Sequence, residues 1–119
     1  MLYLIGLGLD EGDLSLKALE EMKKCDALYT ELYTSVWGGN LDKLSRQMGK
    51  KIIALERENV ESDFLVGEAK KKDIALLVSG DPLTATTHMQ LVMDAGKEGI
   101  KTEIIHAASV YTAVAETGL

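Results

Sequence analysis

A dense group of polar residues follows one apolar stretch of the sequence. Residues 79–88 read Ser-Gly-Asp-Pro-Leu-Thr-Ala-Thr-Thr-His and hold a carboxylate, several hydroxyl groups and an imidazole. Gly80 and Pro82 fix the backbone that aims Asp81, whose carboxylate can accept hydrogen bonds from ligand hydroxyl or amino groups. The segment therefore predicts a ligand site centred on Asp81. The alternative is that Asp81 or a neighbouring threonine only caps the next helix. His88 is more typical of packing or capping than of catalysis.

Glycines and small residues follow two further apolar stretches. Residues 6–13 read Gly-Leu-Gly-Leu-Asp-Glu-Gly-Asp. The paired glycines let the backbone approach a ligand closely, but Glu11 occupies a position where the dinucleotide fingerprint requires glycine or alanine. A purely structural tight turn is an equal alternative. Residues 106–110, His-Ala-Ala-Ser-Val, place a candidate N-cap at Ser109, where backbone donors could receive a carboxylate or polar ligand edge.

Aromatic residues distinguish a fourth segment, residues 31–40. It carries Tyr33, two glycines and Trp37, the only tryptophan of the chain. Aromatic side chains on a loop can mark a partner surface. The alternative is that they fold over the local core.

The elements that position these segments follow from the hydrophobic pattern. Five apolar runs alternate with helix-like segments, which is typical of β-α units in a parallel sheet. Nearly continuous hydrophobicity suits strands that are covered on both faces. We therefore predict an α/β, three-layer α/β/α domain with a five-stranded, mostly parallel sheet, whose strand ends form the ligand crevice. The predicted strands are residues 2–6, 27–31, 51–55, 73–78 and 102–106.

Apolar spacing predicts five helices between and after these strands. The first covers residues 14–24 with Ser15 as its cap, and the second covers 41–48. Asn59 would cap a third helix that runs to about Lys72, with Val60 and Phe64 facing inward. The fourth helix carries an apolar stripe, and the fifth begins near Ser109. The predicted stripe consists of Ala85, Met89, Val92 and Met93.

Length and composition indicate one ordinary folded domain. The chain has 119 residues, of which 46% are hydrophobic and 27% charged, enough for one core without disulfides or structural metal. Cys25 is the only cysteine, so no internal disulfide forms, and no cysteine-histidine cluster predicts zinc. The start lacks a basic leader, and no apolar run approaches the roughly 20 residues of a membrane span. We expect a cytoplasmic protein, and the net charge of -6 argues against nucleic acid.

Taken together, the four segments resemble the diphthine synthases, a branch of the tetrapyrrole methylase superfamily of methyltransferases, along essentially the whole chain. The resemblance rests on residues 4–9 (Leu-Ile-Gly-Leu-Gly-Leu), 31–35 (Glu-Leu-Tyr-Thr-Ser), 80–83 (Gly-Asp-Pro-Leu), 85–88 (Ala-Thr-Thr-His) and 106–110. The superfamily shares the first and third of these patterns. The second and fourth point to the diphthine branch.

This resemblance implies a two-domain protein that binds S-adenosylmethionine in the cleft between its domains and forms a homodimer. The implied substrate is translation elongation factor 2, whose modified histidine is methylated on its side-chain amino group during diphthamide biosynthesis. Carried over by position, the implied cofactor-binding residues are Leu9, Asp81, Thr84, Ser109 and Val110. Thr84 occupies a position where the family varies, so a backbone contact is expected there. The resemblance implies no metal, and no catalytic residue is assigned.

Members of the family are longer than this chain by a whole domain. Residues 1–119 therefore correspond to the N-terminal, cofactor-binding half, and the second domain is absent from this chain. The chain is either a piece of a longer protein or a natural single-domain relative. The alternatives to a diphthine synthase are a porphyrin- or corrin-precursor methyltransferase of the same superfamily and a non-catalytic dimerisation domain.

A receiver-type signalling domain would have a similar length and acidity. It requires a phosphoacceptor aspartate after the third strand and a lysine after the fifth. Residues 55–57 (Leu-Glu-Arg) and 106–108 (His-Ala-Ala) supply neither.

Overall fold

The computed structural model describes residues 1–33, 36–84 and 86–118. Its five strands form one sheet in the order β3-β2-β4-β1-β5, and each pair of neighbours is parallel. The strands are β1 (Leu2–Gly6), β2 (Ala27–Glu31), β3 (Ile52–Ala54), β4 (Ile74–Val78) and β5 (Thr102–Ile105). The helices are α1 (Leu16–Lys24), α2 (Leu41–Met48), α3 (Arg57–Glu61), α4 (Phe64–Ala69), α5 (Met89–Lys97) and α6 (Val110–Ala113), with 3-10 turns η1 (Glu11–Asp13) and η2 (Val114–Thr117).

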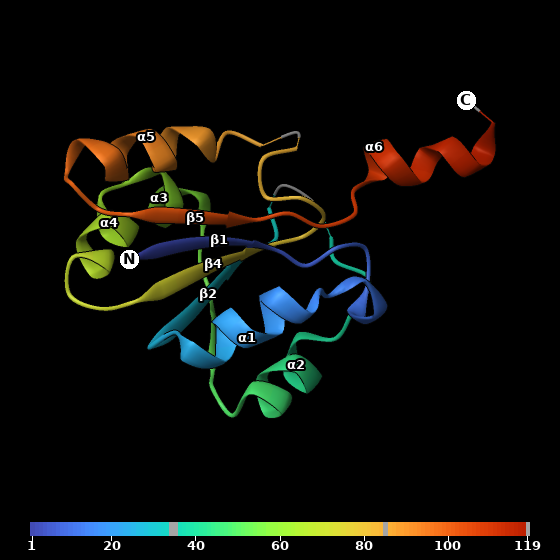
Figure 1. Cartoon of the computed structure of the whole chain (residues 1–119), viewed down its shortest axis with the longest axis horizontal. Coiled ribbons are helices and arrows are strands. Elements are labelled where there is room, and N and C mark those ends of the chain that lie inside the picture. The colour runs from blue at the N-terminus through green and yellow to red at the C-terminus, as the bar shows by residue number, and fades with distance from the viewer. Residues whose placement is uncertain (34–35, 85, 119) are drawn as a thin grey trace.

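Helices cover both faces of the sheet, which confirms the predicted three-layer α/β/α arrangement. Helices α1 and α2 lie on one face, and α3, α4 and α5 lie on the other (Figure 1). Successive side chains of a strand point to opposite faces. In β4, Ile74, Leu76 and Val78 therefore pack beneath α3, α4 and α5, while Ala75 and Leu77 pack against α1 and α2. All five are buried, which explains the uninterrupted apolar run in the sequence.

Lys50 closes the carboxyl end of α1. Its Nζ donates hydrogen bonds to the carbonyl oxygens of Met22 (2.8 Å), Lys23 and Cys25. Carbonyls at a helix end lack partners within the helix and carry partial negative charge, so the ammonium group stabilises them. At the other end, the Ser15 hydroxyl accepts a backbone N–H of the first turn, as predicted.

The predicted third helix is wrong in its extent, because the chain forms two short helices, α3 and α4, in its place. Helix α3 begins after Glu56, whose backbone N–H donates to the Asn59 side chain at 3.3 Å, so Asn59 is not the N-cap. The Ser62 hydroxyl accepts the N–H of Phe64 at 3.2 Å and competes locally with helix continuation. Val60 is buried as expected, and Phe64, although 37% exposed, packs edge-on against buried Tyr29 with 5.5 Å between the ring centroids.

The predicted fourth helix exists as α5, and its apolar stripe is correct only in part, because Val92 packs against the core whereas the two methionines of the stripe are half exposed. Met89 and Met93 are each 51% exposed, whereas Leu91 and Ala95 are buried. Both pairs have the i, i+4 spacing of one helix face, so periodicity alone could not choose between them. Ala85, also assigned to this stripe, lies outside the described residues.

Helix α6 and η2 project beyond the carboxyl ends of the strands and away from the body of the domain (Figure 1).

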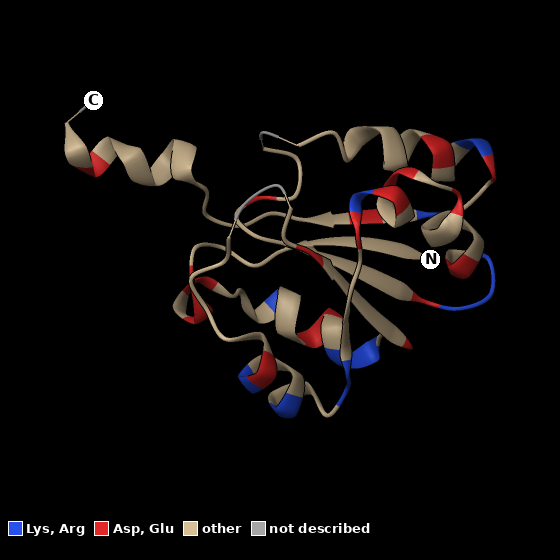
Figure 2. Ribbon diagram, turned by 180° about the vertical axis from the view of Figure 1, so that it is seen from behind, with Lys and Arg blue, Asp and Glu red and all other residues tan. Residues whose placement is uncertain are grey.

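Strand boundaries were predicted correctly for β1 and β2, while β3, β4 and β5 are shorter than predicted by one residue at one or both ends. Charged residues avoid the centre of the sheet and lie mainly on helices and connections (Figure 2). Among the described helices, none has the length and apolarity that crossing a membrane requires.

Candidate functional site

The sheet has a topological switch point between β1 and β4. The chain leaves β1 toward α1 on one face of the sheet, and it leaves β4 toward α5 on the opposite face. Connections that part in this way leave a crevice at the carboxyl ends of the two strands, where open parallel sheets bind ligands. The loops after β1, β4 and β5 meet at this edge, which we call the carboxyl edge.

The glycines of the carboxyl edge are needed because the loop backbones touch. Gly8 and Gly80 exchange two backbone hydrogen bonds of 3.2 and 2.8 Å. A Cβ atom on Gly6 would lie 2.7 Å from the Gly80 carbonyl oxygen, 2.8 Å from Ala107 Cβ and 3.0 Å from Pro82 Cδ. Gly80 also has a φ of +71°, in the left-handed region that favours glycine. The paired glycines Gly6 and Gly8 thus allow three loops to close on one another, which supports the structural alternative, while their close approach to a ligand stays a prediction.

Asp81 joins the loop after β4 to the loop after β5. Its carboxylate is buried, and Oδ2 lies 2.7 Å from Nδ1 of His106 and accepts the backbone N–H of Ala107 at 3.2 Å. Oδ1 accepts the N–H of Leu83 at 3.0 Å. Asp81 therefore does not cap the following helix. The N-cap of α5 is His88, which has no side-chain capping bond.

The environment keeps the Asp81 carboxylate ionised at neutral pH. Burial raises the pKa of Asp81, but the hydrogen bonds from Leu83, His106 and Ala107 outweigh burial and hold the pKa below its ordinary value. An ionised carboxylate has about four acceptor positions. Three are used by the bonds described above, so one remains for a ligand hydroxyl or amino group.

Leu9 and Thr84 lie on two of the loops at the carboxyl edge. Leu9 is half-buried, and its backbone N–H donates to Asp13 Oδ2 at 2.9 Å. The Thr84 N–H donates to the Asp81 carbonyl at 3.2 Å, which closes a turn. A backbone contact from Thr84 to a ligand would therefore have to use its carbonyl oxygen.

Ser109 and Val110 lie where the loop after β5 enters α6. Ser109 is buried, and its hydroxyl accepts the N–H of Tyr111 at 3.2 Å, which confirms the predicted N-cap. The hydroxyl hydrogen remains available as a donor. Val110 is 65% exposed, so its side chain offers apolar surface beside this edge.

The aromatic residues of the loop after β2 have local roles. Trp37 is buried in the core beneath α1 and α2, and its Nε1 donates to the Leu7 carbonyl at 3.2 Å, which confirms the core alternative for this residue. The Tyr33 ring is covered by the Arg57 guanidinium, whose Cζ lies 4.5 Å from the ring centroid, a cation-π geometry. Of the branch-specific stretches 31–35 and 85–88, residues 34, 35 and 85 lie outside the described residues.

Sequence reasoning missed a buried pair at the far end of the loop after β4. Nε2 of His88 lies 3.0 Å from Oε1 of Glu31, and the side chains are only 2% and 1% exposed. The Thr86 hydroxyl links His88 to the start of the loop, because it accepts the His88 N–H at 3.3 Å and donates to the Pro82 carbonyl at 2.9 Å. A signal was present in the sequence, since Glu31 is a carboxylate at the end of an apolar strand.

Two carboxylate-imidazole pairs therefore hold the loop after β4 at its two ends. The pair of Asp81 and His106 fixes its start to the loop after β5, and the pair of Glu31 and His88 fixes its end to β2. We call these the edge clamps. They hold in place the segment that carries Asp81 and Thr84.

The fold and the carboxyl edge define an α/β domain with a ligand crevice at a topological switch point. The family described as tetrapyrrole (corrin/porphyrin) methylases matches residues 1–118. The chain therefore belongs to the tetrapyrrole methylase family, as its motifs indicated.

Several relatives of the chain carry names that refer to diphthine. A diphthine synthase from Methanocaldococcus jannaschii is 49% identical over all of this chain and 48% of its own length. A diphthine methyl ester synthase from Candida albicans is 50% identical over all of this chain and 41% of its own length. A crystal structure of a diphthine synthase superposes with a TM-score of 0.93 at 43% identity, covering all of this chain and 49% of that one. The chain thus spans about half the length of the curated relatives that it matches.

Proposed function

We propose that this chain forms the cofactor-binding half of an S-adenosylmethionine-dependent methyltransferase of diphthamide biosynthesis. The observation that carries the proposal is the identity of 49–50% over the whole chain with two relatives whose names both refer to diphthine. Membership of a methylase family supports methyl transfer as the reaction class. The proposed acceptor is the side-chain amino group of the modified histidine of translation elongation factor 2.

The residues of the carboxyl edge fit S-adenosylmethionine. The remaining acceptor position of Asp81 suits a hydroxyl or amino group of the cofactor, and the Ser109 hydroxyl can still donate. The half-buried Leu9 and the exposed Val110 offer apolar surface to a purine ring. We therefore propose Leu9, Asp81, Thr84, Ser109 and Val110 as the cofactor-binding residues, with Thr84 acting through its backbone carbonyl.

Methyl transfer requires the protein to position the methyl donor and the acceptor, and it requires no nucleophile from the protein. Bound S-adenosylmethionine would supply a methyl group on a sulfonium sulfur for in-line displacement by the acceptor nitrogen, which would give up a proton. Such an in-line displacement depends on alignment of the reacting atoms and on exclusion of water. The edge clamps, Asp81 with His106 and Glu31 with His88, hold the two ends of the loop after β4 in place for this alignment. We assign no catalytic residue.

We further propose that a second domain outside residues 1–119 closes the cofactor cleft and that the protein is a cytoplasmic homodimer. The match to only half of each relative supports the second domain. An apolar surface on α6 and η2 is also typical of a face that another domain or subunit covers. Its exposed residues are Val110, Tyr111 and Val114. On this account residues 1–119 fold alone but do not turn over substrate, because one wall of the cleft is missing.

Methyl labelling tests the proposed substrate. The whole protein is incubated with S-adenosylmethionine labelled on its methyl group and either elongation factor 2 that bears the diphthamide precursor or porphyrin precursors. We expect label on elongation factor 2 and none on the porphyrin precursors. Label on the porphyrin precursors alone would contradict this proposal and would assign the protein to the porphyrin- or corrin-precursor methyltransferases of its family.

A carboxylate oxygen is a second candidate acceptor, because one of the relatives is named a diphthine methyl ester synthase. Mild base hydrolyses a methyl ester but leaves an N-methyl group in place. Label that remains on elongation factor 2 after base treatment supports the amino group as acceptor, whereas released label supports the ester.

A further inference from the structure

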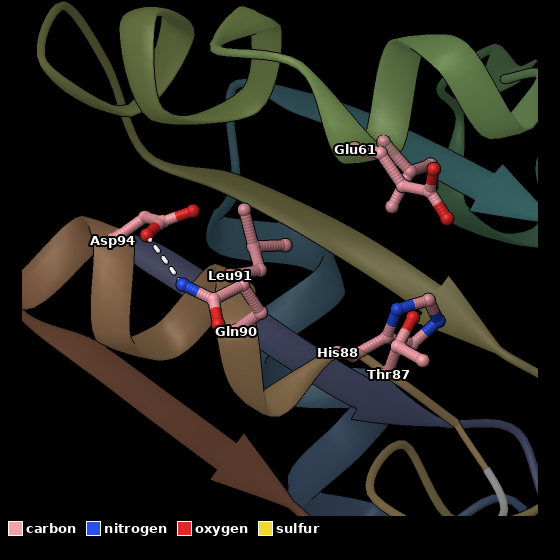
Figure 3. A pocket seen from close by; sticks show the side chains of 7 residues that line it. Glu61, Thr87, His88, Gln90, Leu91 and Asp94 are labelled. Carbon is pink, nitrogen blue, oxygen red and sulfur yellow. Dashed lines mark hydrogen bonds between the residues drawn. The ribbon is translucent and has the colours of Figure 1, made fainter.

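A cavity of about 360 Å³ lies between α3 and α5, on the sheet face opposite α1 and α2 (Figure 3). None of the five proposed cofactor-binding residues lines it. Its floor is formed by buried side chains, those of Val60, Leu91 and His88, which are 4%, 5% and 2% exposed. Its rim is polar and more exposed, and consists of Glu61, Thr87, Gln90 and Asp94.

The charge of this rim is negative. Glu61 on α3 and Asp94 on α5 carry the carboxylates, and no lysine or arginine is present among the described residues that line the cavity. Asp94 Oδ1 accepts a hydrogen bond from Gln90 Nε2 at 2.8 Å, and Glu61 Oε1 lies 3.5 Å from Arg57 Nη1. Each carboxylate therefore keeps acceptor capacity for a ligand.

A neighbouring cavity of about 290 Å³ provides an internal comparison. It lies along α4 and α5 and shares Asp94, but Lys70 and Lys97 also line it. In that cavity two lysines accompany the carboxylates of Asp63, Asp94 and Glu98, whereas the described lining at the α3 end holds two carboxylates and no cation, and Arg57 pairs with Glu61 from outside the lining. That end adjoins Thr87 and His88, which belong to the loop held by the edge clamps.

We infer that the cavity between α3 and α5 binds a basic side chain, lysine or arginine, presented by a protein partner. Such side chains lay their aliphatic stem along apolar surface and keep the charged head at a polar rim. Val60 and Leu91 suit the stem, and either rim carboxylate, Glu61 on α3 or Asp94 on α5, suits the head; the two lie on opposite sides of the cavity (Figure 3). That the partner is the methyl-accepting protein rests on the proposed function. A side chain bound here would lie beside the loop that also carries Asp81.

The site is tested first with a small probe. Pentylammonium is titrated into the ¹⁵N-labelled chain and compared with pentanol and pentanoate, which share its stem and differ in charge. We expect saturable shifts of the amide signals of residues 60–61 and 87–94, strongest affinity for the cation and no binding of the anion. Equal affinity for pentanol, or shifts confined to other residues, would overturn the inference.

Substitutions of the rim carboxylates test whether their charge binds the probe. Replacing both rim carboxylates, Glu61→Gln with Asp94→Asn, removes the partly exposed ion pair whichever carboxylate forms it and should weaken pentylammonium binding about 2- to 5-fold. The control Glu20→Gln removes an exposed carboxylate of α1 on the opposite face and should leave affinity unchanged. Unchanged affinity in the double variant would refute the site.

The partner is tested with the whole protein. The double variant should raise the KM for elongation factor 2 about 2- to 5-fold and leave the affinity for S-adenosylmethionine unchanged. An unchanged KM would refute the assignment of the partner. A protein that binds pentylammonium but transfers no methyl group would instead refute the proposed function while the cation site stands, so the two failures are distinguishable.

Discussion

Replacing His88 by alanine should lower the free energy of unfolding by about 3–5 kcal/mol. The imidazole lies 3.0 Å from the Glu31 carboxylate, and both side chains are almost completely buried. Truncating the buried imidazole both breaks this contact and leaves a cavity in the interior, losses that together typically cost this amount. For a domain of this size, 1 kcal/mol corresponds to about 3–5 °C in Tm, so His88→Ala should melt about 10 °C or more below the parent chain.

The other edge clamp provides a matched control. His106 lies 2.7 Å from the Asp81 carboxylate, but its side chain is 69% exposed. Water can replace much of an exposed partner, and exposed ion pairs contribute about 0–1 kcal/mol. His106→Ala should therefore cost less than about 1 kcal/mol. The two substitutions remove the same chemical group, so the difference between them measures the effect of burial.

Urea unfolding followed by Trp37 fluorescence and by circular dichroism measures both changes. The dependence of the free energy on urea should stay constant across the variants, so that midpoint shifts report stability. His88→Gln, which can keep a donor near Nε2, should lose only about 0.5–1.5 kcal/mol. A double-mutant cycle with Glu31→Gln should show a coupling of about 0.5–3 kcal/mol. Equal losses for His88→Ala and His106→Ala, or no coupling to Glu31, would refute the reasoning.

Three further predictions concern the edge and the core. Gly6→Ala should lower the free energy of unfolding by about 1–3 kcal/mol, because the new Cβ would lie 2.7 Å from a backbone oxygen, and urea unfolding measures the loss. The folded-state pKa of Asp81 is lowered, so its stabilisation is present above the unfolded value of about 3.9 and is lost as pH falls through the folded value. Asp81→Asn should therefore flatten the loss of stability below pH 4 in urea titrations. Burial raises the pKa of Cys25 to about 11, so the thiol should resist Ellman's reagent at neutral pH until urea unfolds the chain; rapid reaction of the folded chain would contradict its burial.

Features that depend on local pattern were predictable from the sequence. The strand Ile74–Val78 is apolar throughout because both of its faces are covered, and the loop that follows stood out because Gly80, Asp81 and Pro82 occur together at its start. The predicted position of Asp81 at the end of a central strand is confirmed. Its role in binding a cofactor stays a prediction.

Features that depend on distant contacts were not predictable in this way. Glu31 and His88 are separated by 57 positions in the sequence, and only the parallel pairing of β2 with β4 brings their segments together. At the break between α3 and α4 the backbone of Ser62 is extended and its hydroxyl accepts the Phe64 N–H, a local contact that the apolar spacing does not encode. The buried face of α5 was decided by packing, because Met89 with Met93 and Leu91 with Ala95 have the same spacing.

The carboxyl edge is proposed to hold S-adenosylmethionine through Asp81. Titration of S-adenosylmethionine into the ¹⁵N-labelled chain tests it most directly, because every proposed cofactor residue has its own amide signal. We predict saturable shifts at Leu9, Asp81, Thr84, Ser109 and Val110. We also predict that Asp81→Ala weakens binding about 5- to 150-fold without unfolding the chain, the effect of losing one desolvated polar contact of about 1–3 kcal/mol. Shifts confined to the cavity between α3 and α5, or unchanged affinity in a folded Asp81→Ala variant, would contradict the claim.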